Sequence, residues 1–132
     1  MKPGRVLDSS VFIEAQRGSK TALRAIAEAV SAGPVVLPSI ASLEFRAAPR
    51  IPKRWRRWFE AQEARLGVAS LDAGAARAGA RVARHMARQG RRLASADAAV
   101  VGCGLARGAT VIVTADDDFT DLPAPFRVER VR

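Results

Sequence analysis

The sequence has few of the residues that build the commonest catalytic sites. Its 132 residues include one histidine, His85, and one cysteine, Cys103, too few for a zinc site or an intramolecular disulfide. Neither a G-x-S-x-G nucleophile motif nor a phosphate-binding P-loop is present. No apolar run approaches the roughly 18 residues of a membrane span, and Asp8 and Glu14 interrupt the apolar stretch that a secretion signal needs. We therefore expect a cytoplasmic protein held together by packing.

Basic residues are in clear excess. Lysine and arginine total 22 against 13 acidic residues, which gives a net charge of +9. This balance favours a polyanionic partner, either nucleic acid or an acidic protein, although an arginine-rich coding bias would produce it too. The length and the 48% hydrophobic content suit one compact domain over residues 1–132.

Short apolar runs alternate with amphipathic segments along the chain. We expect strands at residues 6–7, 35–37, 68–71, 109–114 and 126–131. We expect helices from about residue 9 and at residues 19–31, 39–48, 52–66, 72–89 and 97–107. Ser9 or Ser10 would cap the first helix; the second would bury one face made of Ala22, Leu23, Ile26, Ala27 and Val30. The alternation predicts an α/β fold with a mostly parallel sheet, whose sites form beyond the carboxyl ends of the strands.

Four acidic residues occupy unusual places in this pattern. Asp8 ends the first strand, and Asp116 follows the strand at 109–114. Glu44 and Asp97 lie on helices made otherwise of apolar or small residues. Carboxylates brought together repel one another, and a divalent cation removes that conflict. An all-oxygen set of ligands points to Mg²⁺ or Mn²⁺.

Each acid also has an ordinary structural explanation. Asp8 and Asp97 are suitable helix caps, and Glu44 could pair with Arg46. Residues 116–118, all aspartate, could form a solvated turn. Their joint placement is what favours a shared site.

The ordered segments resemble PIN-domain ribonucleases, and most closely the VapC-type toxins of bacterial toxin–antitoxin pairs. RVLDSSVFIE resembles the opening strand and first acid of the family, and VVLPSIASLEF the second strand and the helix that carries a glutamate. LASADAAVVGCGLARGATVIVTADDDF resembles the helix of the third acid, the following strand and its Thr-x-Asp turn. The similarity is weakest over residues 49–92.

The resemblance implies a three-layer α/β/α fold and Mg²⁺- or Mn²⁺-dependent cleavage of RNA. It also implies a cognate antitoxin protein and a homodimer. By position, Asp8, Glu44 and Asp97 match the three most regular acids, and Asp116 matches the fourth. Asp118 occupies another position that is often acidic, so the fourth ligand is Asp116, Asp118 or both. Two hydroxyl residues, Ser9 and Thr114, match positions beside the site.

We expect one or two ions, held first by Asp8 and Asp97, to activate water for attack on a phosphodiester, with Glu44 bridging or activating water. Two basic features suggest contacts with RNA. The helix at 72–89, which Asp72 would cap and Gly90 would end, carries an arginine stripe, which we define as Arg77, Arg81, Arg84 and Arg88. On its other side, facing the core, we expect Ala75, Ala78, Val82, Met86 and Gln89. The stripe would bind phosphates or be an ordinary solvated face. Trp55 and Trp58, among basic residues, would stack on bases or, as we favour, anchor the core or an interface.

Other functions with the same fold class make different demands on the sequence. A phosphatase of the paired-aspartate type needs a second aspartate two residues after the first, where Ser10 stands. A receiver domain needs a lysine near the last strands, and none follows Lys53. A PIN-like module without activity, which only binds RNA or a protein, remains an alternative that measured cleavage would exclude.

Overall fold

Five short strands form one parallel sheet. The computed structural model describes residues 3–131, and its strands are β1 (Gly4–Leu7), β2 (Val35–Pro38), β3 (Val68–Ala69), β4 (Ala109–Thr114) and β5 (Arg127–Arg130). They lie in the order β3-β2-β1-β4-β5, and every neighbouring pair is parallel. The strand order reverses between β1 and β4. In such sheets the crevice at that point, beyond the carboxyl ends of the strands, is where ligands bind.

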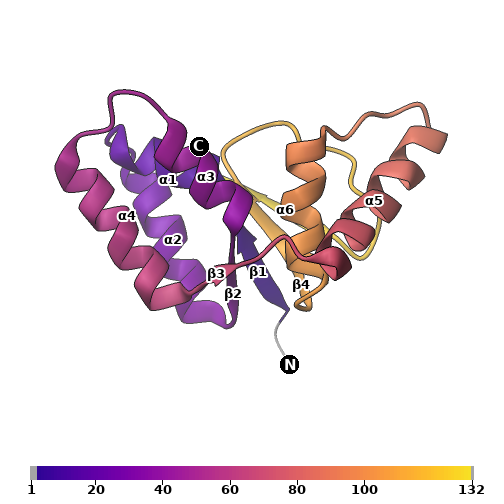
Figure 1. Cartoon of the computed structure of the whole chain (residues 1–132), viewed down its shortest axis with the longest axis horizontal. Helices are drawn as coiled ribbons and strands as arrows, with labels where there is room; N and C mark the ends of the chain where they lie inside the picture. Colours follow the sequence, from indigo (N-terminus) through magenta and orange to yellow (C-terminus); the bar gives the residue numbers. More distant parts are fainter. Residues whose placement is uncertain (1–2, 132) are drawn as a thin grey trace.

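Helices cover both faces of this sheet. They are α1 (Ser9–Gln16), α2 (Lys20–Ala32), α3 (Ser39–Ala47), α4 (Lys53–Leu66), α5 (Ala73–Arg88) and α6 (Ser95–Leu105). Side chains of a strand alternate between faces, so Leu7 packs with α1, α2 and α4 while Val6 packs with α5 and α6. Figure 1 shows these two groups of helices on opposite sides of the sheet. The predicted three-layer α/β/α fold is confirmed. In the part of the chain described, no helix is both long and apolar enough to cross a membrane.

The first two helices differ in detail from the sequence prediction. Asp8, and neither Ser9 nor Ser10, occupies the position before α1, because both serines already lie inside the helix and their hydroxyls bond to acidic side chains. In α2 the buried residues are Ala22, Ile26 and Ala29. Leu23 and Ala27, which we expected on that face, are exposed. The helix buries a narrow stripe with spacings of four and three residues, because α1 covers only that side.

The third strand is shorter than predicted. It ends after Ala69, because the next backbone segment turns away from the sheet and the N–H of Leu71 donates to Ser39 Oγ at 3.2 Å. The following helix behaves as expected: Asp72 Oδ1 accepts the N–H of Ala75 at 2.9 Å, which caps α5. Gly90, with a φ of +73°, ends the turn after it.

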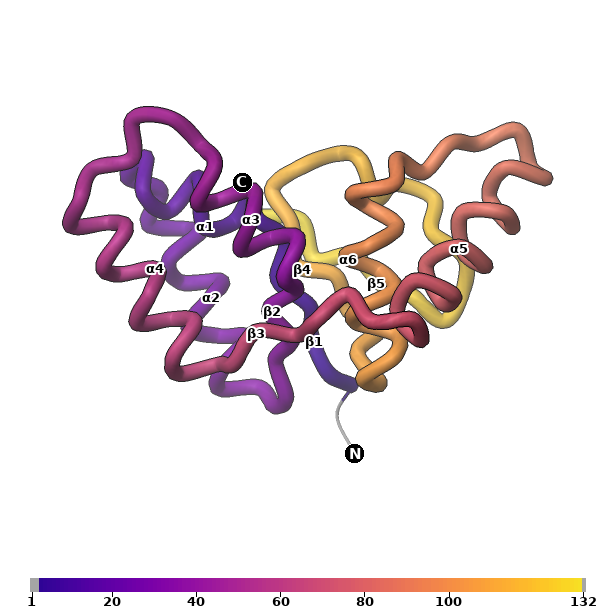
Figure 2. The backbone as a smooth tube through the Cα atoms, in the orientation of Figure 1, coloured from indigo at the N-terminus to yellow at the C-terminus, as the bar shows by residue number. Residues whose placement is uncertain are grey.

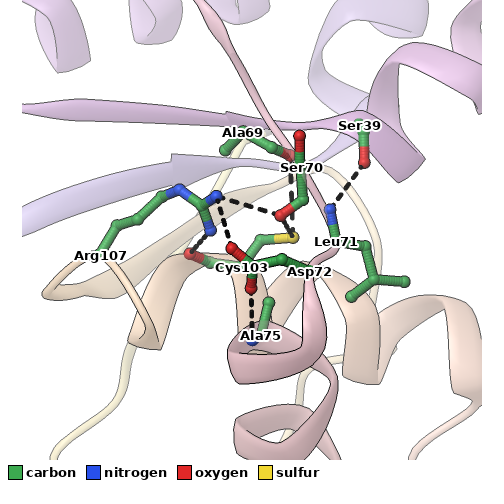
Figure 3. Close-up of polar contacts among 8 residues, drawn as sticks. All are labelled: Ser39, Ala69, Ser70, Leu71, Asp72, Ala75, Cys103 and Arg107. Atoms are coloured by element: carbon green, nitrogen blue, oxygen red, sulfur yellow. Dashed lines mark hydrogen bonds and ion pairs between the residues drawn. The ribbon is translucent and has the colours of Figure 1, made fainter.

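The guanidinium of Arg107 ties the end of α6 to this turning segment. It donates to the carbonyl of Cys103 at 3.3 Å and to that of Ser70 at 3.1 Å, and lies 3.6 Å from Asp72 Oδ2 (Figure 3). The buried Cys103 thiol faces the carbonyls of residues 69 and 70. Burial raises the pKa of this thiol. Cys103 is therefore buried as a small packing residue.

Glycines set the distance between α5 and α6. A Cβ atom on Gly79 would lie 2.3 Å from the carbonyl oxygen of Ala98, and one on Gly102 would lie 2.2 Å from that of Ala75. Gly102 therefore permits close contact between the two helices. Gly104 faces the sheet, where a Cβ would lie 3.2 Å from Val6.

The two tryptophans of α4 belong to the core side of that helix. Trp58 packs against Phe12 and Phe45 with ring centroids 5.9 and 6.5 Å apart, and Trp55 contacts Trp58 edge to face. Both are half-buried against the core. This confirms the preferred interpretation of anchors for packing over platforms for base stacking.

Candidate active site

Asp8 is buried at the carboxyl end of β1 and is held by two hydroxyl groups. The residue is 3% exposed. Its Oδ2 atom accepts hydrogen bonds from Ser10 Oγ at 2.7 Å and from Thr114 Oγ1 at 3.0 Å. Asp8 does hold the cap position of α1, but its side chain makes no capping hydrogen bond and bonds to the two hydroxyls instead. Two donors on one oxygen fix the direction of the carboxylate.

The same two hydroxyls also bind the turn that follows β4. Ser10 Oγ accepts the backbone N–H of Ala115 at 2.9 Å, and Thr114 Oγ1 accepts that of Asp116 at 3.0 Å. Each hydroxyl therefore donates to Asp8 and accepts from the turn that carries the fourth acid. We predicted Thr114 beside the site, but sequence reasoning missed Ser10. The available signal was a serine two residues after the first acid, at the start of a largely apolar helix.

Glu44 points from α3 toward α1. Its Oε1 atom accepts a hydrogen bond from Ser9 Oγ at 3.0 Å, and the residue is half-buried. Arg46 does not pair with Glu44, because its guanidinium bonds to Glu63 of α4 instead. Ser9 thus lies next to an acid, as predicted, and the alternative of a Glu44–Arg46 pair is wrong.

Asp97 lies in the first turn of α6, which begins two residues earlier than expected. Ala94 holds the cap position, so Asp97 is not the helix cap. Its pKa is raised to about 6, first by burial and then by the negative charges of four other acids, Asp118, Asp8, Glu44 and Asp116. The negative charge of every other acid predicted at the site therefore raises the pKa of Asp97. Figure 2 traces how α3, α6 and the turn after β4, far apart in the sequence, meet there.

The turn at residues 116–118 is exposed, as the solvated-turn interpretation expects, yet its three aspartates differ in surroundings. Partial burial raises the pKa of Asp116, and the charges of Asp8 and Asp118 raise it further, while Arg130 opposes them. Asp117 pairs with Arg130 instead. Asp118 exerts the largest charge effect on Asp97, and Asp8 the largest on Asp116. The acids linked by these charge effects are the acidic cluster, which we define as Asp8, Glu44, Asp97, Asp116 and Asp118.

The chemistry of the cluster suits a hard divalent cation. All its donors are carboxylate oxygens, and the pKa of Asp97 is raised first by burial and then by repulsion, a repulsion that a bound cation would offset. Within residues 3–131, no three of these side chains already converge as tightly as ligands around one ion. Asp116 and Asp118 are exposed, whereas Asp8 is buried.

The arginine stripe lies apart from this cluster on the outer side of α5. All four arginines are exposed, while Ala75, Ala78, Val82 and Met86 of the same helix are buried. The predicted division of the helix into a basic face and a core face is confirmed, although Gln89, which we assigned to the core side, is exposed. It lies beyond the last helical residue, where the chain turns at Gly90.

The sequence matches one protein family along most of its length. The PIN domain matches residues 5–125. The chain therefore belongs to the PIN domain family, as the resemblance predicted. No curated protein matches it significantly.

Solved structures of this fold cover nearly the whole chain. VapBC2 from Rickettsia felis, bound to a DNA fragment from its promoter, matches with a TM-score of 0.77 at 13% identity, covering 97% of this chain and 98% of that one. DNA-bound VapBC from Salmonella typhimurium matches with a TM-score of 0.76 at 22% identity and 98% coverage of both chains. VapBC-5 from Mycobacterium tuberculosis, a member of the VapBC family of toxin–antitoxin systems, matches with a TM-score of 0.66 at 27% identity and 99% coverage of both.

Proposed function

We propose that the protein is a metal-dependent endoribonuclease of the VapC toxin type. The observation that carries the proposal is the acidic cluster at the carboxyl end of a PIN-domain sheet, where burial and four other carboxylates raise the pKa of Asp97 to about 6. The net charge of +9 supports a polyanionic substrate.

Asp8 and Asp97 would hold Mg²⁺ or Mn²⁺, with Glu44, Asp116 and Asp118 completing the set. A bound divalent cation supplies Lewis acidity toward water and phosphate. Ser10 and Thr114 orient Asp8, and Ser9 donates a hydrogen bond to Glu44. With a pKa raised to about 6, mainly by burial, Asp97 is largely protonated below pH 6 and largely ionised at neutral pH.

The test is cleavage of a single-stranded RNA by the purified protein with Mg²⁺ or Mn²⁺. We expect activity that EDTA removes and that Asp97→Asn lowers by about two orders of magnitude or more, because the variant loses a charged ligand without changing shape. Glu28→Gln is the matched control, since this exposed residue of α2 also loses one charge but lies outside the cluster.

Cleavage that survives EDTA, or that Asp97→Asn leaves undiminished, would contradict the proposal. A folded protein that binds RNA but never cuts it would favour the alternative of a PIN-like module without activity.

The expected setting follows from the same family. We propose that a cognate antitoxin inhibits the protein, because the similar structures above are VapBC complexes. An arginine from such a partner would neutralise the acidic cluster. We also propose a homodimer, a single domain over residues 1–132 and a cytoplasmic location, to which the single buried thiol is suited.

A further inference from the structure

Arg130 connects the edge strand of the sheet to the turn that carries Asp116 and Asp118. It is the last residue of β5 and pairs in register with Thr114 at the end of β4. Its Nε atom donates to the carbonyl oxygen of Ala115 at 3.2 Å, and its Nη1 atom bonds to Asp117 Oδ1. The side chain is only 28% exposed, so the guanidinium is held against the protein.

The turn at residues 115–118 is therefore held by contacts on two sides. On one side, the hydroxyls of Ser10 and Thr114 accept the backbone N–H groups of Ala115 and Asp116. On the other side, Arg130 donates a hydrogen bond to the carbonyl of Ala115 and forms an ion pair with the side chain of Asp117. Its ion pair with Arg130 thus holds Asp117, the middle aspartate of the turn, against the end of β5.

We infer that Arg130 is a positioning residue that fixes the turn at residues 115–118, so that Asp116 and Asp118 face the cation while Asp117 serves as its anchor. The inference rests on the proposed function, because it assigns an outer partner to the proposed metal site. A guanidinium suits the task, since its planar set of donors reaches a backbone carbonyl and a carboxylate at once, whereas an ammonium is a single point of charge. The role also explains why a basic side chain stands so close to acids that must attract a cation.

The test measures cation binding without RNA or turnover. Mn²⁺ affinity is followed by electron paramagnetic resonance of the free ion in the wild type and in Arg130→Gln, Arg130→Lys, Asp117→Asn and the double variant Arg130→Gln/Asp117→Asn. Asp116→Asn is measured as well, as a variant of a proposed ligand. We expect Arg130→Gln to weaken Mn²⁺ binding about tenfold, the lower end of the loss typical of outer-shell partners. Arg130→Lys should recover part of that loss. Asp117→Asn should weaken binding by less than Asp116→Asn does, and its effect should not add to that of Arg130→Gln.

Amide hydrogen exchange at residues 115–118 supplies a second readout that needs no cation. We expect faster exchange there in Arg130→Gln and no change in Arg127→Gln. Arg127 is the matched control because it lies on the same strand and contacts only Glu129 among the ion pairs of residues 3–131.

Wild-type Mn²⁺ affinity and wild-type exchange in Arg130→Gln would overturn the inference. So would a complete loss of Mn²⁺ binding in Asp117→Asn, which would make Asp117 a ligand. If the wild type itself binds no Mn²⁺, the proposed function fails, and hydrogen exchange still decides whether Arg130 holds the turn. If Arg130→Gln does not fold, Arg130→Lys and Asp117→Asn carry the same comparison.

Discussion

The pKa of Asp97 reflects both its burial and the charges of the other acids. Asp97 comes from α6, and its pKa of about 6 reflects burial first and then the charges carried by β1, α3 and the turn after β4. A carboxylic acid that titrates so close to neutral pH is common where catalysis or metal binding has brought like charges together. The consequence extends to stability, because the folded protein must ionise Asp97 against its neighbours while the unfolded chain need not.

The raised pKa predicts a pH-dependent effect of Asp97→Asn on stability without metal. The folded pKa lies above the ordinary value of 3.8, so the folded state binds more protons between these values. Asp97 therefore costs stability progressively as pH rises from about 4 to about 6, and the cost stays constant above. We expect Asp97→Asn to raise Tm at pH 7.5 in EDTA by about 3–5 °C, taking roughly 1 kcal/mol after solvent screening.

Thermal unfolding at pH 7.5 and near pH 4.5, in EDTA and with Mg²⁺, checks this. The gain should shrink at the lower pH, and Mg²⁺ should raise the Tm of the wild type more than that of the variant. Glu28→Gln should show neither behaviour. A variant less stable than the wild type at both pH values would contradict the assigned pKa.

Packing between α5 and α6 determines where Asp97 lies. The two helices approach so closely that Gly79 has no room for a Cβ atom, and the backbone atom in its way is the carbonyl of Ala98, the neighbour of Asp97. Arg107 then holds the other end of α6 to the segment that enters α5. The acid is thus placed by the fit of two helices rather than by any contact of its own.

This close contact predicts opposite outcomes for two glycines of α5. Gly79→Ala should lower the free energy of unfolding by about 1–3 kcal/mol, because rigid backbone must move to admit the methyl group. The same change should reduce cleavage beyond the loss of folded protein, because Ala98 carries Asp97 with it.

Gly74→Ala is the matched control. Its Cβ would meet only the Asp72 carboxylate at 3.5 Å, so the higher helix propensity of alanine should stabilise the protein by up to about 1 kcal/mol. Urea unfolding separates the two variants. Equal stabilities for Gly79→Ala and Gly74→Ala would show that α5 and α6 are less tightly packed than described.

The whole molecule combines a local acidic cluster with a strong overall positive charge. Its net charge of +9 attracts a polyanion at long range, while the five carboxylates would repel phosphate unless a cation were bound. The exposed arginine stripe on α5 is one place where phosphates could bind. Under the proposed function, polyanion binding would fall to the basic faces and chemistry to the acidic edge.

We expect replacement of the arginine stripe to change the salt dependence of RNA binding. In an Asp97→Asn background, alanine at all four positions should reduce the slope of log affinity against log salt concentration. The reduction should reach up to about 3, because each phosphate contact of a single strand contributes roughly 0.7 to that slope. Binding to a fluorescent single-stranded RNA between low and moderate salt measures it.

A control with the same loss of charge replaces Lys20, Arg24, Arg57 and Arg65, which are exposed on α2 and α4. If both quadruple variants lose the same slope, RNA follows the overall charge and the stripe has no special role.

Local sequence patterns alone were enough for most of the architecture. The run at 109–114 became β4 with the predicted bounds, and Asp72 and Gly90 bracket α5 as expected, because these signals act within a few residues of chain. The stripe buried by α2 and the early end of β3 could not be predicted, since each depends on which element lies opposite. Asp8, Glu44, Asp97 and Asp116 could be selected as candidates from their residue types and neighbours.

Only the tertiary structure decided how those acids are held. Ser10 and Thr114 are 104 residues apart in the chain and share Asp8 as an acceptor, a relation that exists only once β1 and β4 are paired. Likewise, three consecutive aspartates look equivalent in the sequence until β5 brings Arg130 against the middle one. Residue types and local patterns determined the elements and the chemistry of the donors, while contacts between distant segments determined which donor faces the centre and which anchors the turn.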